Sequence, residues 1–142
     1  MGRKIRCIGA DLTKFRASDG SNFSSGIFYK AVCPESMWEN ANLTGSDFRG
    51  SQLQGAQFTG AALDRSHLSA CDARQARFSK ASLRQAEMDH MNLFQGSLEK
   101  ADLTEANLTA SNMYGVEFLG AIIDGAQLVD TNVKMTKLEQ KR

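Results

Sequence analysis

The sequence has little proline, few cysteines and no long hydrophobic run. Its 142 residues include one proline, Pro34, and three cysteines, and no apolar stretch is long enough to span a membrane. A single proline excludes a proline-rich linker, and the basic start, MGRKIRC, has no apolar signal segment after it. We therefore expect one cytoplasmic domain that does not enter a membrane.

Neither sign of charge predominates in the sequence. Seventeen Lys plus Arg stand against sixteen Asp plus Glu, which gives a net charge of +1. A chain with so little net charge creates no strong field around the whole molecule. Nucleic acid, membranes and strongly acidic molecules are therefore not favoured as partners.

A five-residue repeat organises the sequence. From Ala41 to Phe58 a large apolar residue occurs every five positions, and a small residue precedes each one by two positions. This period is neither the 3.6 of a helix nor the 2 of a flat strand, so it indicates a repeat architecture. We call the large residue the centre, the residue two before it the small position, and the residue between them the middle position. The two residues after the centre are the first and second turn positions.

The frame is unbroken from Ser21 to Leu138. A small and a large inward residue on each side would fill a narrow tube, with polar residues turned outward. The expected structural core includes Phe23, Phe28, Trp38, Leu43, Phe48, Leu53, Phe58, Leu63, Phe78, Leu83, Leu103 and Phe118.

Before Ser21 the same pattern continues one residue out of phase. The pairs are Ile5 with Cys7, Ala10 with Leu12, and Phe15 with Ala17. One extra residue between Ala17 and Ser21, forming a bulge at a corner, would restore the frame. We therefore divide the chain into an irregular amino-terminal cap with out-of-phase repeats at 1–20, the repeat proper at 21–140 and a tail at 141–142.

These residues resemble the pentapeptide repeat family, whose consensus is A(D/N)LXX. The consensus stands in Ala41-Asn42-Leu43, Ala101-Asp102-Leu103 and Ala106-Asn107-Leu108. The resemblance implies an all-β solenoid, a right-handed quadrilateral parallel β-helix with four pentapeptides per coil. The chain would then form about six to seven coils, in which residues twenty apart stack on one another.

Neither a metal site nor a disulfide is expected. Cys7, Cys33 and Cys71 all fall at inward positions, and Cys33 and Cys71 would lie two coils apart, about 10 Å, whereas a bridge needs Cα atoms within about 7 Å. The residues nearest to a metal set are His67, Glu87, Asp89 and His90, but they follow no ligand-spacing motif. No nucleophile has a base and an orienting group within evident reach, so we expect no cofactor and no enzymatic activity.

A basic run should form a band around the middle of the rod. It comprises Arg74, Arg77, Lys80 and Arg84. The band is either a solvated belt balanced by nearby acids, such as Asp64 and Glu87, or a contact for a phosphate or an acidic partner. Salt-sensitive binding would distinguish the two.

Apolar residues at outward positions indicate candidate interfaces. Phe94 and Tyr114, twenty apart, should stack on the third side of the coil, with Met135 at the adjoining corner. The last coils carry Leu119, Ile122 and Val129 outward, and the closing segment TKLEQKR is too short to cover the core at Val133 and Leu138. Because an open end of a β tube needs a cover, we expect a homodimer that meets carboxyl end to carboxyl end.

The sequence therefore favours a non-enzymatic, rigid scaffold for protein–protein interaction. An alternative comes from the resemblance, because some pentapeptide repeat proteins look like B-form DNA and bind DNA gyrase, which gives protection from quinolones. Such mimicry needs an acidic surface, and here Glu99, Asp102 and Glu105 make only one local patch. A role as a module of an enzyme or a secreted effector remains a third possibility, although nothing catalytic is fused to the repeat.

Overall fold

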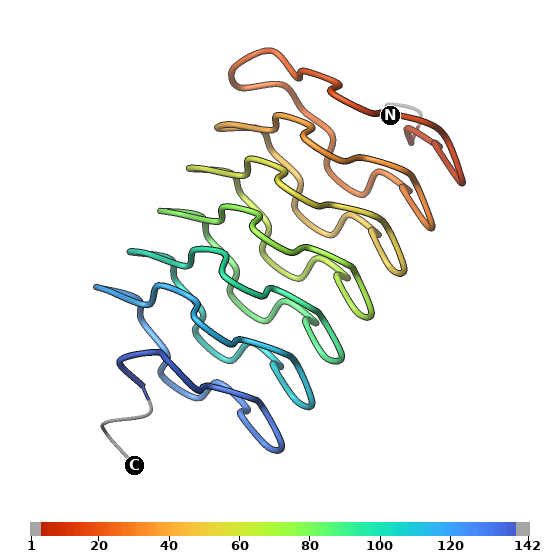
Figure 1. Ribbon diagram of the computed structural model, residues 1–142. Coiled ribbons are helices and arrows are strands. Elements are labelled where there is room, and N and C mark those ends of the chain that lie inside the picture. Colours follow the sequence, from red (N-terminus) through yellow and green to blue (C-terminus); the bar gives the residue numbers. More distant parts are fainter. Residues whose placement is uncertain (1–3, 139–142) are drawn as a thin grey trace.

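The computed structural model describes residues 4–138, and Figure 1 shows them wound into coils stacked along one axis. Within this range there is no helix and no extended strand, only single bridge residues at the middle positions, each followed by a turn. The bridges are parallel, and from Asn22 onward they join residues twenty apart, as in Asp47 with His67 and His67 with Glu87. Four bridged sides therefore make one coil, as the sequence predicted.

Each side of a coil makes three backbone hydrogen bonds to the coil that follows it. The N–H of Leu43 donates to the carbonyl of Ala62 at 2.7 Å, and the N–H of Gly45 donates to the carbonyl of Asp64 at 2.9 Å. In the other direction, the N–H of Ala62 donates to the carbonyl of Ala41 at 2.9 Å. A coil thus offers two N–H groups and one carbonyl per side toward the carboxyl end, and two carbonyls and one N–H toward the amino end.

A tight turn closes every corner. At a representative corner the N–H of Ala61 donates to the carbonyl of Phe58 at 3.0 Å, and Gly60 has φ of +70°. From Gly9 to Met135 the residue just before each small position has a positive φ. This is the conformation of a type II turn, in which glycine is the least strained residue, and it explains why glycine recurs at Gly45 and Gly60.

The consensus Asp or Asn at the middle position supplies a hydrogen bond that the coils cannot. The N–H of the first turn position does not take part in the ladder between coils. The side chain of Asn42 accepts the N–H of Thr44 at 3.2 Å, and Asp102 accepts that of Thr104 at 3.0 Å. Asp and Asn favour such local turns because their short side chains accept a backbone N–H two residues ahead. This explains why the consensus has Asp or Asn at its second position.

Stacked apolar side chains fill the tube. The rings of Trp38 and Phe58 are 6.2 Å apart and nearly parallel, and those of Phe58 and Phe78 are 4.8 Å apart. Of the twelve expected core residues, eleven are at most 5% exposed, whereas Phe23 is half-buried. Phe23 belongs to the first coil, so among the described residues no coil covers it from the amino-terminal side.

The described part of the amino-terminal segment forms three sides of the first coil. Its bridges, such as Arg6 with Ile27 and Arg16 with Met37, join residues 21 apart, whereas Asn22 pairs with Asn42 at a spacing of twenty. One extra residue therefore lies at that corner, where the N–H of Ser21 donates to the carbonyl of Ser18 at 3.0 Å. The described residues 4–20 therefore continue the repeat, one residue out of phase with the coils that follow. The tail expected at 141–142 lies outside the described residues.

Candidate interaction surface

A ladder of asparagine side chains lies along the third side of the last three coils. The amide of Asn112 donates to the side-chain oxygen of Asn92 at 3.2 Å, and Asn132 donates to Asn112 at the same distance. Each oxygen also accepts the backbone N–H two residues ahead, which belongs to Phe94, Tyr114 or Lys134. The ladder thus fixes both the asparagine side chains and the backbone of the residues that follow them.

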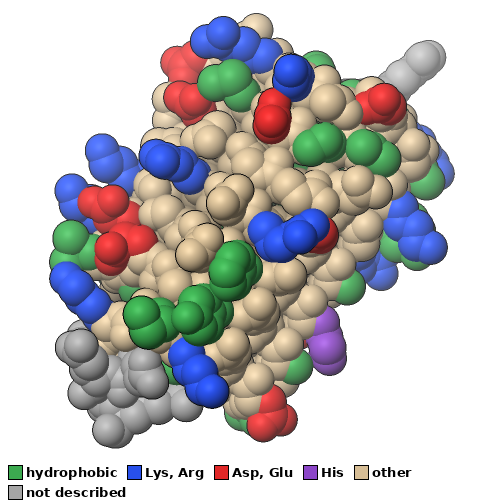
Figure 2. Space-filling view, in the orientation of Figure 1, with side chains coloured by type: hydrophobic (Ala, Val, Ile, Leu, Met, Phe, Trp, Pro, Cys, Tyr) green, Lys and Arg blue, Asp and Glu red, His purple; other side chains and the backbone are tan. Residues whose placement is uncertain are grey.

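Phe94 and Tyr114 stack on this fixed backbone. Their ring centroids are 5.4 Å apart with an interplanar angle of 17°, and both side chains are half-buried. The expected stack of these two residues is therefore present. Met135, expected at the adjoining corner, is 69% exposed. Figure 2 shows apolar side chains gathered over the coils nearer the carboxyl end, on a surface that is otherwise mainly polar.

A shallow hollow of about 340 Å³ adjoins the aromatic pair. It is lined by Gln54, Arg74, Gln75 and Phe94. The guanidinium of Arg74 is held to Asp72, with Nε at 2.9 Å and Nη2 at 2.8 Å, so it is drawn toward the middle position of its own side. Gln54 donates to the same carboxylate at 2.9 Å, and its own Oε1 is buried without a hydrogen-bond partner in the structure. Gln54 and Gln75 are not predictable as lining residues from the sequence, because their proximity depends on side-chain directions.

The basic band is partly neutralised. Besides Arg74, Arg84 pairs with Asp102 at 3.2 Å, and its backbone N–H donates to Asp64. Among residues 4–138, Arg77 and Lys80 form no ion pair, and both are exposed. The belt therefore lies where the sequence placed it, with two cations free of carboxylate partners within the described chain.

The carboxyl-terminal coil exposes much of the apolar surface that the sequence indicated. Leu119 is 50% exposed, Ile122 47% and Val129 64%. Leu138 is half-buried. Val133, which we expected at an open end, is only 4% exposed, because it points into the tube at an inward position. Val133 therefore supports the core and is not itself part of the exposed surface.

The remaining polar candidates are separate pairs. His67 lies beside Glu87 in a bridge, and His90 contacts Asp89 at 3.2 Å. Within the described residues no group of three or more His, Cys, Asp or Glu side chains could hold a metal ion. The four residues named from the sequence therefore lie in two separate pairs.

The three cysteines are free thiols. Cys33 and Cys71 are buried, Cys7 is half-buried, and burial raises the pKa of the Cys33 and Cys71 thiols to about 12. The Sγ of Cys71 donates to the carbonyl of Phe48. A protonated, buried thiol reacts slowly, so Cys33 and Cys71 are structural side chains.

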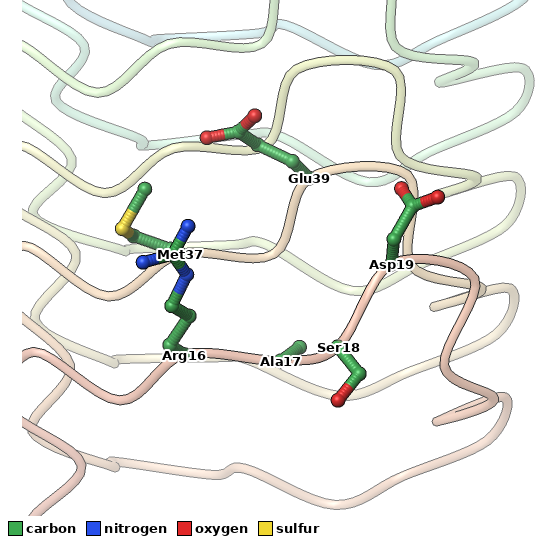
Figure 3. Close-up of a pocket in the computed structure, with 6 residues that line it drawn as sticks. All are labelled: Arg16, Ala17, Ser18, Asp19, Met37 and Glu39. Carbon is green, nitrogen blue, oxygen red and sulfur yellow. The ribbon is translucent and has the colours of Figure 1, made fainter.

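A second hollow, of about 270 Å³, lies at the corner that carries the extra residue. Figure 3 shows its lining residues, Arg16, Ala17, Ser18, Asp19, Met37 and Glu39. The extra residue lengthens the first coil here, so this corner does not stack directly on the next one. Asp19 nevertheless accepts a hydrogen bond from Asn40 at 2.7 Å, which ties the corner to the following coil.

Together these features define a repeat solenoid that presents side-chain ladders. The family model described as pentapeptide repeats (8 copies) matches residues 27–65, 61–99 and 101–140. The chain therefore belongs to the pentapeptide repeat family. It has no significant match among curated protein sequences.

Several solved structures are similar to this chain. The pentapeptide repeat protein Rfr23 from the cyanobacterium Cyanothece 51142 is 22% identical, with a TM-score of 0.47, over 92% of this chain and 89% of that one. A pentapeptide repeat protein of the Arabidopsis thaliana thylakoid lumen is 28% identical, with a TM-score of 0.34, over 87% and 72% of the two chains. QnrB1, a plasmid-mediated fluoroquinolone resistance protein, is 14% identical in a trypsin-treated R167E form, with a TM-score of 0.38, over 94% and 77%.

Among the described residues no helix is long and apolar enough to cross a bilayer.

Proposed function

We propose that this chain is a non-enzymatic scaffold, a rigid rod of about six to seven right-handed coils that binds a protein partner through its third side. The observation that carries the proposal is the stacked pair of Phe94 and Tyr114, 5.4 Å apart and half-buried on a mainly polar surface. Aromatic side chains on a rigid backbone contribute contact area at a low cost in conformational entropy.

The surroundings of the pair have the composition of an interface. Asn92 and Asn112 fix the backbone beneath the two rings, and Arg74 stands at the edge of the adjoining hollow with its guanidinium already oriented by Asp72. Interfaces commonly place aromatic anchors at the centre and polar groups at the rim. The third side therefore resembles a preorganised binding surface more than a uniformly solvated one.

The test is affinity capture from an extract of cells that naturally contain the protein. The proposal expects a partner that binds the wild type and is lost with a Phe94→Asp, Tyr114→Asp double variant. Tyr29→Asp is the matched control, because Tyr29 is also a half-buried aromatic at a first turn position, but on the second side. Equal retention of the partner by the double variant and the wild type would show that the aromatic pair does not contribute to binding.

Mimicry of DNA toward gyrase is the alternative function, and the surface charge argues against it. Asp47 pairs with Arg49 at 2.7 Å, and Asp72 pairs with Arg74 at 2.8 Å, so cations cover carboxylates that mimicry would need exposed. A continuous negative stripe is required to imitate phosphates. A supercoiling assay decides the matter, since inhibition or quinolone protection of gyrase at stoichiometric protein would favour mimicry over the scaffold.

We further propose a cytoplasmic location. Three free thiols, Cys7, Cys33 and Cys71, are consistent with a reducing compartment. Fractionation of cells that naturally contain the protein tests this, and recovery from a membrane or an exported fraction would contradict it.

A further inference from the structure

The last coil leaves backbone groups without a partner along its outer edge. In coils further inside the rod, centre and second-turn N–H groups donate to the next coil, and the carbonyl of the small position accepts from it. Among the described residues, the corresponding groups of the last coil have no backbone partner. On the second and third sides they are the N–H groups of Leu128, Asp130 and Val133 and the carbonyls of Ala126 and Thr131.

The first coil leaves the complementary groups unpaired. Within residues 4–138, no backbone bond uses the carbonyls of Arg6, Ile8, Asp11 and Thr13 or the N–H groups of Arg6 and Asp11. One end of the described rod thus offers mainly donors, and the other end mainly acceptors. Both ends also leave apolar centres only half-buried, such as Leu12 at one end and Leu128 at the other.

We propose that a second copy of this chain docks its first coil on this last coil, head to tail, so that the β-helix continues from one copy into the next. The side centred on Cys7 then lies over the side centred on Leu128, and the side centred on Leu12 lies over that of Val133. The contact uses neither Phe94 nor Tyr114, so it is independent of the scaffold surface proposed above.

The side chains of the two ends match in this register. Ile8 and Val129 are both first turn positions on the second side, and they are 55% and 64% exposed. In the docked pair they stack as Phe94 and Tyr114 do on the third side. Each end therefore covers an exposed apolar side chain of the other end, and burial of both favours association.

Charge complementarity follows a pattern already present inside the molecule. Arg84, a first turn position, pairs with Asp102, the middle position of the next coil, at 3.2 Å, while Asp102 also accepts the N–H of Thr104. Asp11 accepts the N–H of Thr13 in the same way. Head-to-tail docking brings Lys134 to Asp11 in the relation that Arg84 has to Asp102.

The competing arrangement is the dimer that joins two carboxyl-terminal ends. In that dimer two edges of the same kind would face each other in opposite directions. One N–H group would then face another N–H group, and at most two of the three groups on a side would find partners. Head-to-tail docking satisfies both N–H groups and the carbonyl on the side centred on Leu128, and the N–H of Val133 and the carbonyl of Thr131 on the side that follows. Its contact is heterologous and does not close, so it builds longer rods as concentration rises.

Sedimentation velocity on the wild type and two end variants tests the proposal. The wild-type chain is expected to shift from monomer to dimers and longer species between roughly 10 and 300 µM. Ile8→Asp blocks one end and Val129→Asp blocks the other, so each variant alone is expected to stay monomeric. An equimolar mixture of the two variants is expected to form a dimer and nothing longer, because one intact head meets one intact tail.

Other outcomes overturn the proposal. A wild type that remains monomeric at the highest concentration excludes the contact. Ile8→Asp that dimerises while Val129→Asp does not assigns the contact to two carboxyl-terminal ends. Leu119→Asp is the control, because Leu119 is exposed in the last coil but lies outside the head-to-tail contact, and it is expected to assemble like the wild type.

A charge swap tests the register itself. Asp11→Lys alone places two lysines together and is expected to weaken association roughly two- to fivefold at low salt, in line with exposed ion pairs. Adding Lys134→Asp reverses the pair and is expected to restore association. Equal affinities for the wild type, the single variant and the double variant would exclude the proposed register.

Discussion

Met91 lies directly above Cys71 at one corner of the coil, twenty residues further along the chain. The turn hydrogen bonds from their N–H groups are 3.4 Å long at both residues, whereas the corresponding bonds at the other described corners are 2.8–3.3 Å. Both residues occupy the small position, where Ser51 and Ser111 stand in neighbouring coils. Within this column the turn is therefore widest where a sulfur-containing side chain, Cys71 or Met91, occupies the inward corner.

The serine hydroxyls in this column make a bond that Met91 lacks. Ser51 donates to the carbonyl of Phe28 at 2.7 Å, and Ser111 donates to that of Met88. We predict that Met91→Ala destabilises the fold by about 2 to 5 kcal/mol, because Met91 is 1% exposed and its removal leaves a cavity. Met91→Ser should be about 1 kcal/mol more stable than Met91→Ala, since its hydroxyl can bond to the carbonyl of Leu68.

Denaturant unfolding of the two Met91 variants under identical conditions checks this prediction. If the serine variant were the less stable of the two, the hydroxyl would not have joined the column, and its burial without a partner would explain the loss.

The alternation of inward and outward residues along one side predicts a large loss of stability at an inward position and a small change at an outward one. Leu83 is fully buried at a centre, so Leu83→Asp buries an unpaired charge and should cost about 4 kcal/mol or more, enough to unfold much of the rod. Asn42→Asp is the control at an outward middle position, where the oxygen that accepts the N–H of Thr44 is retained and only the exposed 3.3 Å bond from the amide to Asn22 is lost. We expect a change within about 0.5 kcal/mol there. Circular dichroism melts distinguish the two, and a folded Leu83→Asp variant would contradict a closed core.

Turn strain predicts a stabilising substitution. Ala70 is an exposed second turn position with φ of +59°, which strains any residue with a Cβ. Ala70→Gly should raise the unfolding free energy by about 0.5 to 1 kcal/mol, because the relief of strain exceeds the entropy cost of glycine. Ala61→Gly, at a buried small position with no positive φ, should instead lower it by about 1 kcal/mol. Chemical denaturation measures both changes, and the same sign at both sites would refute the argument.

The five-residue period was sufficient to predict the coil, its four sides and the stacking of residues twenty apart, because each inward side chain has only one place in a narrow tube. It also located the extra residue before Ser21 and the stack of Phe94 on Tyr114. Features that depend on side-chain directions were not predictable. The guanidinium of Arg84 pairs with Asp102 on the next coil, while Asp64 accepts the backbone N–H of Arg84. The side chain of Gln54 donates to Asp72 and lines a hollow. Val133 points inward, as its place at a centre predicts, and is only 4% exposed.

Acid should loosen the rod through aspartates that accept hydrogen bonds. The hydroxyl of Thr104 holds the pKa of Asp102 below its ordinary value, and the pair with Arg84 acts in the same direction, although burial opposes both. Burial raises the pKa of Asp72, but the hydrogen bonds from Arg74 and Gln54 and the charge of Arg74 together outweigh it and leave that pKa lowered as well. A carboxyl whose pKa is lower in the folded state stabilises the fold above its unfolded value of about 3.9, and this contribution is lost as the pH falls through the folded pKa.

We therefore expect melting temperatures to be steady near neutral pH and to fall once the pH drops below about 4. Asp102→Asn isolates one contribution, because an amide keeps the acceptor for the N–H of Thr104, as Asn42 does for Thr44, but does not titrate in this range. The variant should be less stable than the wild type at neutral pH, and the difference should shrink as the pH is lowered. Parallel melting curves over the whole range, with a constant difference, would show that Asp102 has the same pKa in the folded and unfolded chains.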